Sequence, residues 1–159
     1  MRPPETYPVQ RAFPGRLSTM AHPPGGADLV ASMAALRTSG VDVLVSALTS
    51  GEEAALDLRD ERSAAEAAGL EFHPLPIGDF GVPDRDAITP TLTALVAELR
   101  GGANVVVHCW AGIGRSSLIA ASLLVLDGAD PDEAWRLISA ARGCPVPETD
   151  TQREWIRFT

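Results

Sequence analysis

Lysine is absent from the 159 residues, so all 13 basic residues are arginines, and they face 21 acidic residues. The formal net charge of −8 should repel polyanions, which excludes nucleic acid and anionic membranes as expected partners. Long hydrophobic runs are also missing, because the longest one, Leu118 to Leu126, is interrupted by Ser122 and is too short for a membrane span. The first residues lack the apolar run of a signal peptide, so we expect a soluble, cytoplasmic protein.

Cysteine is nearly absent too, with only Cys109 and Cys144 in the chain. Two cysteines are too few for a disulfide framework or for a structural zinc site. We interpret Cys144 as an ordinary loop or buried residue and not as a redox partner of Cys109. Cys109 directly follows His108, and a lone cysteine beside a histidine favours a catalytic interpretation.

Strands and helices alternate along the chain, which predicts an α/β fold with a central, mostly parallel sheet flanked by helices. The length and the 45% hydrophobic content fit one domain, expected over residues 15–159, after an irregular Pro-rich leader over residues 1–14. The expected strands are 15–20, 41–48, 70–75 and 104–107. The expected helical segments are 28–38, 51–68, 88–99, 118–126 and 130–142, with a last amphipathic piece over 149–158.

The segment from His108 to Ser116 joins a short buried strand to an apolar helix. Its backbone N–H groups can converge ahead of the helix N-terminus and form an anion site. In sheets of this kind, ligands gather at the carboxyl ends of strands, which is where this segment lies. Its two glycines permit tight curvature and a close approach of an oxyanion to the backbone. The residues expected to hold a phosphate are Trp110, Ala111, Gly112, Ile113, Gly114 and Arg115.

Cys109 is the expected nucleophile of this loop. The positive field of the loop stabilises a thiolate, which can attack phosphorus in line and form a thiophosphoryl intermediate. Arg115 offers a planar guanidinium that can bind two phosphate oxygens at once. Ser116 can donate a hydrogen bond to the departing sulfur, and His108 is expected to brace the loop instead of acting as a base. This chemistry needs no metal and no cofactor.

The leaving oxygen needs a proton, and a general acid on a neighbouring loop contributes about 10²–10⁴ in rate. Residues 76–85 are too rich in Gly and Pro for regular structure, and loops of this kind often carry function. The strand before them should run parallel to the strand before Cys109, so both would emerge at one edge of the sheet. Asp79 is the favoured acid, and Asp84 in the same loop is its competitor.

Other polar and aromatic residues receive structural interpretations. Glu52 and Glu53 are expected to be the solvated start of a helix, where acidic residues are favoured. His22 and His73 show no metal-ligand spacing. Trp110 is expected either at the rim of the pocket or packed beneath the loop.

The order His-Cys-x-x-Gly-x-x-Arg-Ser resembles the signature of the cysteine-dependent protein tyrosine phosphatase superfamily. Residues 76–83 are similar to the general-acid loop of its small, dual-specificity-like members, which favours Asp79 over Asp84. Residues 148–152 resemble the superfamily's segment with two glutamines that help to place the hydrolytic water. Gln152 matches the second glutamine, whereas Glu148 stands where the first would be. The resemblance extends from about residue 15 to the last residue.

The resemblance implies a tyrosine-phosphatase-like fold and the hydrolysis of phosphotyrosine in protein or peptide substrates, and it leaves phosphoserine and phosphothreonine open. Lipid phosphatases of the superfamily usually carry lysines in the signature loop, so phosphoinositides are not expected. Two alternatives stay open. One is a catalytically weak module that captures phosphorylated partners, and the other is a rhodanese-like sulfur transferase. The five residues between Cys109 and Arg115 fit the phosphatase loop better.

Overall fold

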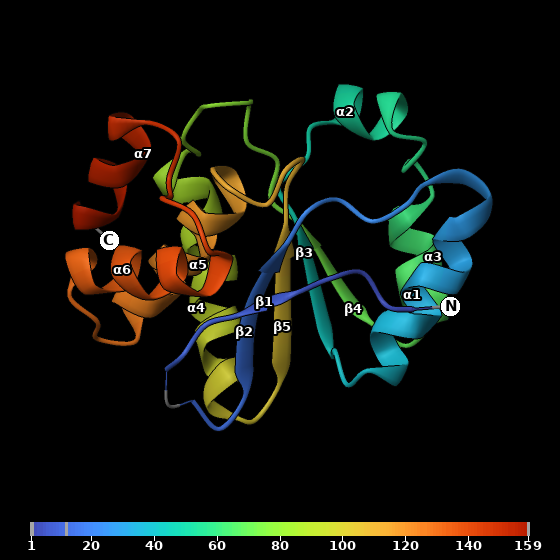
Figure 1. Ribbon diagram of the computed structural model, residues 1–159, viewed down its shortest axis with the longest axis horizontal. Helices are drawn as coiled ribbons and strands as arrows, with labels where there is room; N and C mark the ends of the chain where they lie inside the picture. The colour runs from blue at the N-terminus through green and yellow to red at the C-terminus, as the bar shows by residue number, and fades with distance from the viewer. Residues whose placement is uncertain (1, 12, 159) are drawn as a thin grey trace.

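The computed structural model describes residues 2–11 and 13–158, which form one sheet with helices on both faces (Figure 1). The strands are β1 (Tyr7–Pro8), β2 (Arg16–Met20), β3 (Val43–Ser46), β4 (Glu71–Pro74) and β5 (Asn104–His108). The helices are α1 (Leu29–Thr38), α2 (Ser50–Ala55), α3 (Glu61–Ala67), α4 (Arg85–Arg100), α5 (Arg115–Leu126), α6 (Pro131–Arg142) and α7 (Asp150–Trp155), with the 3-10 helices η1 (Gly26–Asp28) and η2 (Ile156–Phe158). Among the helices of the described ranges, none has both the length and the apolar character that crossing a membrane requires.

The five strands lie in the order β1-β2-β5-β3-β4. β1 is antiparallel to β2, and the other neighbouring strands are parallel, which confirms the predicted α/β fold with a mostly parallel sheet. β5, the strand that precedes Cys109, therefore lies in the middle of the sheet. Two residues of the segment expected to be irregular, Tyr7 and Pro8, pair with Thr19 and Ser18, because an extended chain can satisfy the free edge of β2. The division of the chain at residue 15 stays a prediction.

Alternating side chains of the strands supply two cores, one on each face of the sheet. On β5, Val105 and Val107 belong to the core under α4, α5 and α6, whereas Val106 belongs to the core under α1 and α3. Figure 1 shows these two helical layers on opposite sides of the strands. Because both faces are covered, β3 and β5 each carry three consecutive apolar residues, 43–45 and 105–107, instead of alternating apolar and polar ones.

The structure differs from the predicted helices in three places. The helical material expected over 51–68 is divided into α2 and α3, because Asp57 between them adopts a left-handed φ of 55°. α4 and α5 begin at Arg85 and Arg115, earlier than the expected starts at 88 and 118. The predicted starts followed the apolar pattern, and the first turns of these helices carry polar residues.

Candidate active site

Cys109 lies one residue beyond the end of β5, at the edge of the sheet where the parallel strands end. Its side chain is almost buried, with 3% of its surface exposed. The chain then turns through residues 110–114 into α5, which begins at Arg115. The structure thus places the predicted loop between the central strand and an apolar helix whose N-terminus points at it, where the helix dipole favours an anion.

Gly112 is the residue of this loop that no other amino acid could replace without strain. Its φ is 75°, and a Cβ at this position would lie 2.7 Å from the carbonyl carbon of Met20 and 2.8 Å from the backbone nitrogen of Ala21. Gly114 has an ordinary φ of −91°, but a Cβ there would lie 2.2 Å from Oε1 of Glu148. The loop therefore packs closely against the end of β2 on one side and against Glu148 on the other.

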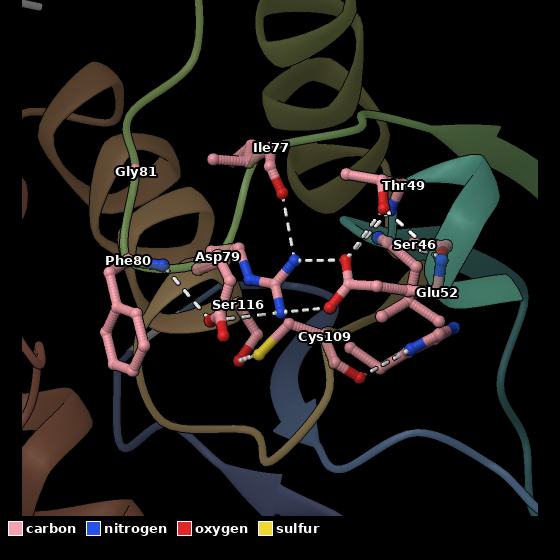
Figure 2. A network of polar contacts seen from close by, with 12 residues as sticks. Ser46, Thr49, Glu52, Ile77, Asp79, Phe80, Gly81, Cys109 and Ser116 are labelled. Atoms are coloured by element: carbon pink, nitrogen blue, oxygen red, sulfur yellow. Dashed lines mark hydrogen bonds and ion pairs between the residues drawn. The ribbon is translucent and has the colours of Figure 1, made fainter. Parts of the chain in front are cut away.

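The sulfur of Cys109 forms a hydrogen bond with the hydroxyl group of Ser116, with 3.2 Å between Cys109 Sγ and Ser116 Oγ (Figure 2). His108 is fully buried behind it. Its Nδ1 lies 3.2 Å from the carbonyl oxygen of Cys109, and its Nε2 lies 2.5 Å from Oε2 of the buried Glu61. Both ring nitrogens of His108 thus have a partner, one in the loop and one on α3. The bracing role of His108 stays a prediction.

Arg115 is 1% exposed, although it carries a charge. Its guanidinium donates from Nη1 to Oε1 of Glu52 at 2.6 Å, from Nη2 to Oε2 of Glu52 at 2.9 Å, and from Nη1 to the carbonyl oxygen of Ile77 at 2.9 Å (Figure 2). Burial by itself would lower the pKa of Arg115, but Glu52 and the nearby Cys109 and Asp79 raise it above its usual value. The same hydrogen bonds hold the pKa of Glu52 below its ordinary value.

The loop after β4 brings Asp79 to this arginine. Backbone hydrogen bonds from Leu75 and Ile77 to the carbonyl oxygens of Ser46 and Ala47 extend the pairing with β3 beyond β4. Asp79 Oδ1 then lies 3.4 Å from Nη2 of Arg115, with more than half of the side chain exposed. Figure 2 shows the Asp79 carboxyl above the sulfur and hydroxyl of the loop.

Asp84, the competing acid, has a different place. Its side chain accepts a hydrogen bond from the backbone N–H of Ala87 and caps α4. It is not among the residues that line the cavity around Cys109, whereas Asp79 is. The two aspartates, which the residue pattern alone left in competition, are thus separated by the structure.

A cavity of about 260 Å³ opens above Cys109. The loop contributes Cys109, Trp110, Ala111 and Arg115 to its wall, and the other lining residues are Glu52, Asp79, Phe80 and Glu148. Trp110 is 42% exposed and its ring lies edge-on to His22, with 5.9 Å between the ring centroids, so Trp110 forms part of the rim. Ile113 packs against the core. Ile113, Gly112 and Gly114 can serve a bound anion only through their backbone.

Gln152 is fully buried and engaged in structural contacts. Its Oε1 accepts hydrogen bonds from the backbone N–H groups of Glu148 and Thr149, and its Nε2 donates to the carbonyl oxygen of Gly81 at 3.2 Å. It closes the capping box of α7 and ties the Asp79 loop to the start of this helix. The water-placing role of Gln152 stays a prediction, because this side chain does not line the cavity.

Sequence reasoning missed two glutamates that support the site. Glu52 was interpreted as part of a solvated helix start, and it does lie in the first turn of α2, where it closes a capping box with Thr49. The solvated part of this interpretation is wrong, because the same carboxylate pairs with the buried Arg115. Glu61 gave no signal, since nothing local marks a helical glutamate as the partner of a histidine on a distant strand.

Potential metal ligands come together away from Cys109. Within the described residues, Glu71, His73 and Glu98 offer atoms that lie within 4.8 Å of one another. Glu71 and His73 belong to β4, the outer strand of the sheet, and Glu98 belongs to α4. The cluster is therefore separate from the cavity above Cys109.

The comparison with known proteins agrees with this geometry. Cyclin-dependent kinase inhibitor 3 of Rattus norvegicus is 28% identical over 123 residues, which cover 76% of this chain and 58% of that protein. The chain thus spans less than two thirds of the length of this relative. The solved structure of kinase associated phosphatase with its catalytic-site cysteine substituted by serine has a TM-score of 0.87 at 22% identity, covering 98% of this chain and 93% of that one. TpbA of P. aeruginosa, solved in complex with pTyr, has a TM-score of 0.63 at 23% identity, covering 94% and 82%.

The fold and the cysteine loop define the class of the small, dual-specificity-like cysteine phosphatases within the protein tyrosine phosphatases. Within this class, the family of the DSP-PTPase phosphatases of polymorphic toxin systems matches residues 19–129. The chain belongs to this family, because the match covers most of its residues. The resemblance predicted from the cysteine signature is thereby confirmed.

Proposed function

We propose that the protein hydrolyses phosphate monoesters of tyrosine in phosphorylated proteins or peptides, through a cysteinyl-phosphate intermediate. The observation that carries this proposal is the shared cavity, in which the nearly buried Cys109, the guanidinium of Arg115 and the carboxyl group of Asp79 all face the same space. A nucleophile, an anion clamp and an acid on one wall are the three groups that monoester hydrolysis needs.

The first step transfers the phosphoryl group to Cys109. The thiolate attacks phosphorus, a sulfur–phosphorus bond forms, and the bond between phosphorus and the tyrosine oxygen breaks with its electron pair going to that oxygen. Asp79, which lies on the cavity wall, gives its proton to the leaving oxygen. Arg115 and the backbone N–H groups of residues 110–114 neutralise the equatorial oxygens.

The second step releases phosphate. A water molecule attacks phosphorus, its proton passes to the Asp79 carboxylate, and the sulfur–phosphorus bond breaks with its electrons returning to sulfur. Ser116 Oγ, 3.2 Å from Cys109 Sγ, donates a hydrogen bond that stabilises the departing thiolate. His108 holds the carbonyl group of Cys109 and so fixes the direction in which the sulfur points.

The assignment of the acid to Asp79 is supported by its distance from Arg115 and by the engagement of Asp84 in capping α4. The substrate class is supported by the family and by a structure of the same fold that holds pTyr. Phosphoserine and phosphothreonine are included as slower substrates, since their phosphate has to reach the same sulfur on a shorter stem.

The test is the hydrolysis of para-nitrophenyl phosphate between about pH 5 and pH 7 in the presence of a chelator. We expect turnover by the wild type, a burst of phosphoenzyme under rapid mixing, and loss of turnover with retained phosphopeptide binding for Cys109→Ser. A wild type that binds phosphotyrosine peptides without hydrolysing them would instead be the capture module. Thiosulfate sulfurtransferase activity without phosphatase activity would establish the rhodanese-like alternative.

A further inference from the structure

The wall of the cavity carries an excess of negative charge. Three of its lining residues are carboxylates, Glu52, Asp79 and Glu148, and Arg115 is the cation among them. Glu52 holds both terminal nitrogens of Arg115, so this pair is close to neutral before a substrate arrives. Asp79 approaches the same guanidinium at 3.4 Å, so Arg115 faces two carboxyl groups, and Glu148 is the lining acid without an ion pair among the described residues.

Of Asp79 and Glu148, Glu148 is the acid that the proposed mechanism does not use for proton transfer. Asp79 has to hold a proton when the substrate binds if it acts as the acid of the first step. Glu148 has no such requirement, and its carboxylate lies against the signature loop, since Oε1 would be 2.2 Å from a Cβ at Gly114. A substrate whose phosphate enters this loop therefore passes next to the Glu148 carboxylate.

The guanidinium groups of the neighbouring arginines keep their charge but do not line the cavity, because backbone carbonyl oxygens and aromatic rings hold them beside it. Arg142 donates to the carbonyl oxygens of Ala111 and Gly112 and lies 4.2 Å from the centre of the Tyr7 ring. Arg85 donates to the carbonyl oxygen of Trp155 and lies over the ring of the same residue. Within the described part of the chain, Arg115 is thus the arginine that reaches the cavity wall.

Two exposed aromatic side chains stand on the same wall. Phe80 is 57% exposed and Trp110 is 42% exposed, which is unusual for large apolar side chains in a folded domain. Phe80 is held there by a φ of 58°, a conformation that costs on the order of 1 kcal/mol for a residue with a Cβ. Aromatic rings at a pocket mouth suit a flat aryl group and also attract cationic side chains.

We infer that the site selects phosphotyrosine flanked by basic residues, and that Glu148 is the residue that determines this preference. The inference rests on the proposed function. The phosphate and the tyrosine ring enter between the signature loop and the aromatic rim, while an arginine or lysine next to the phosphotyrosine meets the Glu148 carboxylate and the rings of Phe80 and Trp110. In substrates with acidic residues next to the phosphotyrosine, these residues are repelled by the Glu148 carboxylate, because the charges have the same sign.

The experiment measures kcat/KM for matched phosphotyrosine peptides whose flanking residues are arginine, serine or glutamate. For the wild type, we expect the arginine peptide to exceed the glutamate peptide by about tenfold at low salt, and this ratio should shrink to about twofold at high salt, because exposed charges are screened over about 3–10 Å. The salt series tests the charge effect without any substitution.

The matched variants are Glu148→Gln, which removes the charge at the cavity and keeps the shape, and Glu66→Gln, which removes an exposed charge on α3 in the other helical layer. Glu148→Gln should reduce the ratio at low salt to about threefold or less, while Glu66→Gln leaves it as in the wild type.

A wild type that hydrolyses para-nitrophenyl phosphate but shows equal rates on all peptides would overturn this inference and leave the proposed function standing. An unchanged ratio in Glu148→Gln, or an equal drop in Glu66→Gln, would overturn the role of Glu148. A wild type inactive on para-nitrophenyl phosphate would overturn the proposed function and the inference with it.

Discussion

Two groups of glutamates in this protein behave in opposite ways, although both are partly buried. At the edge of the sheet that carries Cys109, Glu52 meets the guanidinium of Arg115, and its pKa lies below the ordinary value of 4.5. At the outer strand β4, Glu98 meets burial and the carboxyl group of Glu71, and its pKa rises to about 7. Desolvation raises the pKa in both places, so the charge of the partner decides the outcome.

The two groups therefore differ in their partners: Glu52 pairs with an arginine that lines the cavity, whereas Glu98 shares a hydrogen bond with another carboxyl group. Glu52, whose pKa is lowered by its hydrogen bonds with Arg115, holds both terminal nitrogens of this arginine. The pKa of Glu98, about 7, lies near neutral pH, and the hydrogen bond that Glu98 shares with Glu71 lowers the pKa of Glu71. Substitutions in the first group should therefore change the rate, and substitutions in the second group should change only the pH dependence of stability.

The largest effect is expected for Arg115→Lys. The guanidinium of Arg115 is planar and donates to both carboxylate oxygens of Glu52, whereas the ammonium group of a lysine is a point charge. We therefore expect kcat/KM for para-nitrophenyl phosphate to fall by about 10³. Steady-state kinetics measure this loss, and Glu98→Gln is the control that keeps the wild-type rate. A rate within tenfold of the wild type would remove Arg115 from the proposed mechanism.

Asp79→Ala comes next, with an expected loss of about 10² in kcat on a phosphotyrosine peptide. The loss should be smaller on para-nitrophenyl phosphate, whose leaving group needs a proton less, and the basic limb of the pH profile should disappear. Asp84→Ala is the matched variant in the same loop, and it should keep the rate while the protein loses about 1 kcal/mol of stability with the helix cap. If the basic limb of the pH profile disappears in Asp84→Ala and remains in Asp79→Ala, then Asp84 is the general acid.

Glu52→Gln should destabilise the protein by about 2 kcal/mol at neutral pH, because it leaves the buried Arg115 without its charged partner. The lowered pKa of Glu52 means that its stabilising contribution is complete above about pH 4.5 and is lost as the pH falls through the lower folded-state pKa. Urea unfolding at neutral pH and at about pH 3.5 measures the difference in the free energy of unfolding between the wild type and Glu52→Gln. This difference should be smaller at the acidic pH. A difference in the free energy of unfolding that does not change with pH would show that the ion pair of Glu52 and Arg115 does not stabilise the protein through its charge.

Glu98→Gln has the smallest expected effect and the opposite sign. The raised pKa of about 7 means that the contribution of Glu98 to stability is complete below about pH 4.5 and is lost as the pH rises through 7. Gln stays neutral at every pH, so this variant should match the wild type at about pH 5 and exceed its stability by about 1 kcal/mol at about pH 8.5. Equal stability at both pH values would mean that Glu98 and Glu71 do not share a proton.

Much of the catalytic end could be predicted because its signals are local. A strand of three valines, then a cysteine, two spaced glycines and an arginine before an apolar helix occupy 12 consecutive positions, 104–115, and local spacing alone places them at a strand end. The loop with Asp79 was predictable for the same reason, since a Gly- and Pro-rich segment after a parallel strand emerges at that edge. Helix starts were less accurate because the first turns of α4 and α5 are polar.

The sequence by itself determined the α/β architecture and the position of the cysteine loop at a strand end, and it predicted the nucleophile and the candidate acids, because the periodicity of apolar residues and the conformational needs of glycine act over a few neighbouring positions. Only the tertiary structure decided which acid faces Arg115, which one caps a helix, and which glutamates meet a cation or another carboxylate. Glu52 and Arg115 are 63 positions apart, and Glu61 and His108 are 47 apart. Charge pairing depends on the distance between the two groups in space. The crossover connections between the parallel strands set that distance, and the separation of the residues along the chain does not.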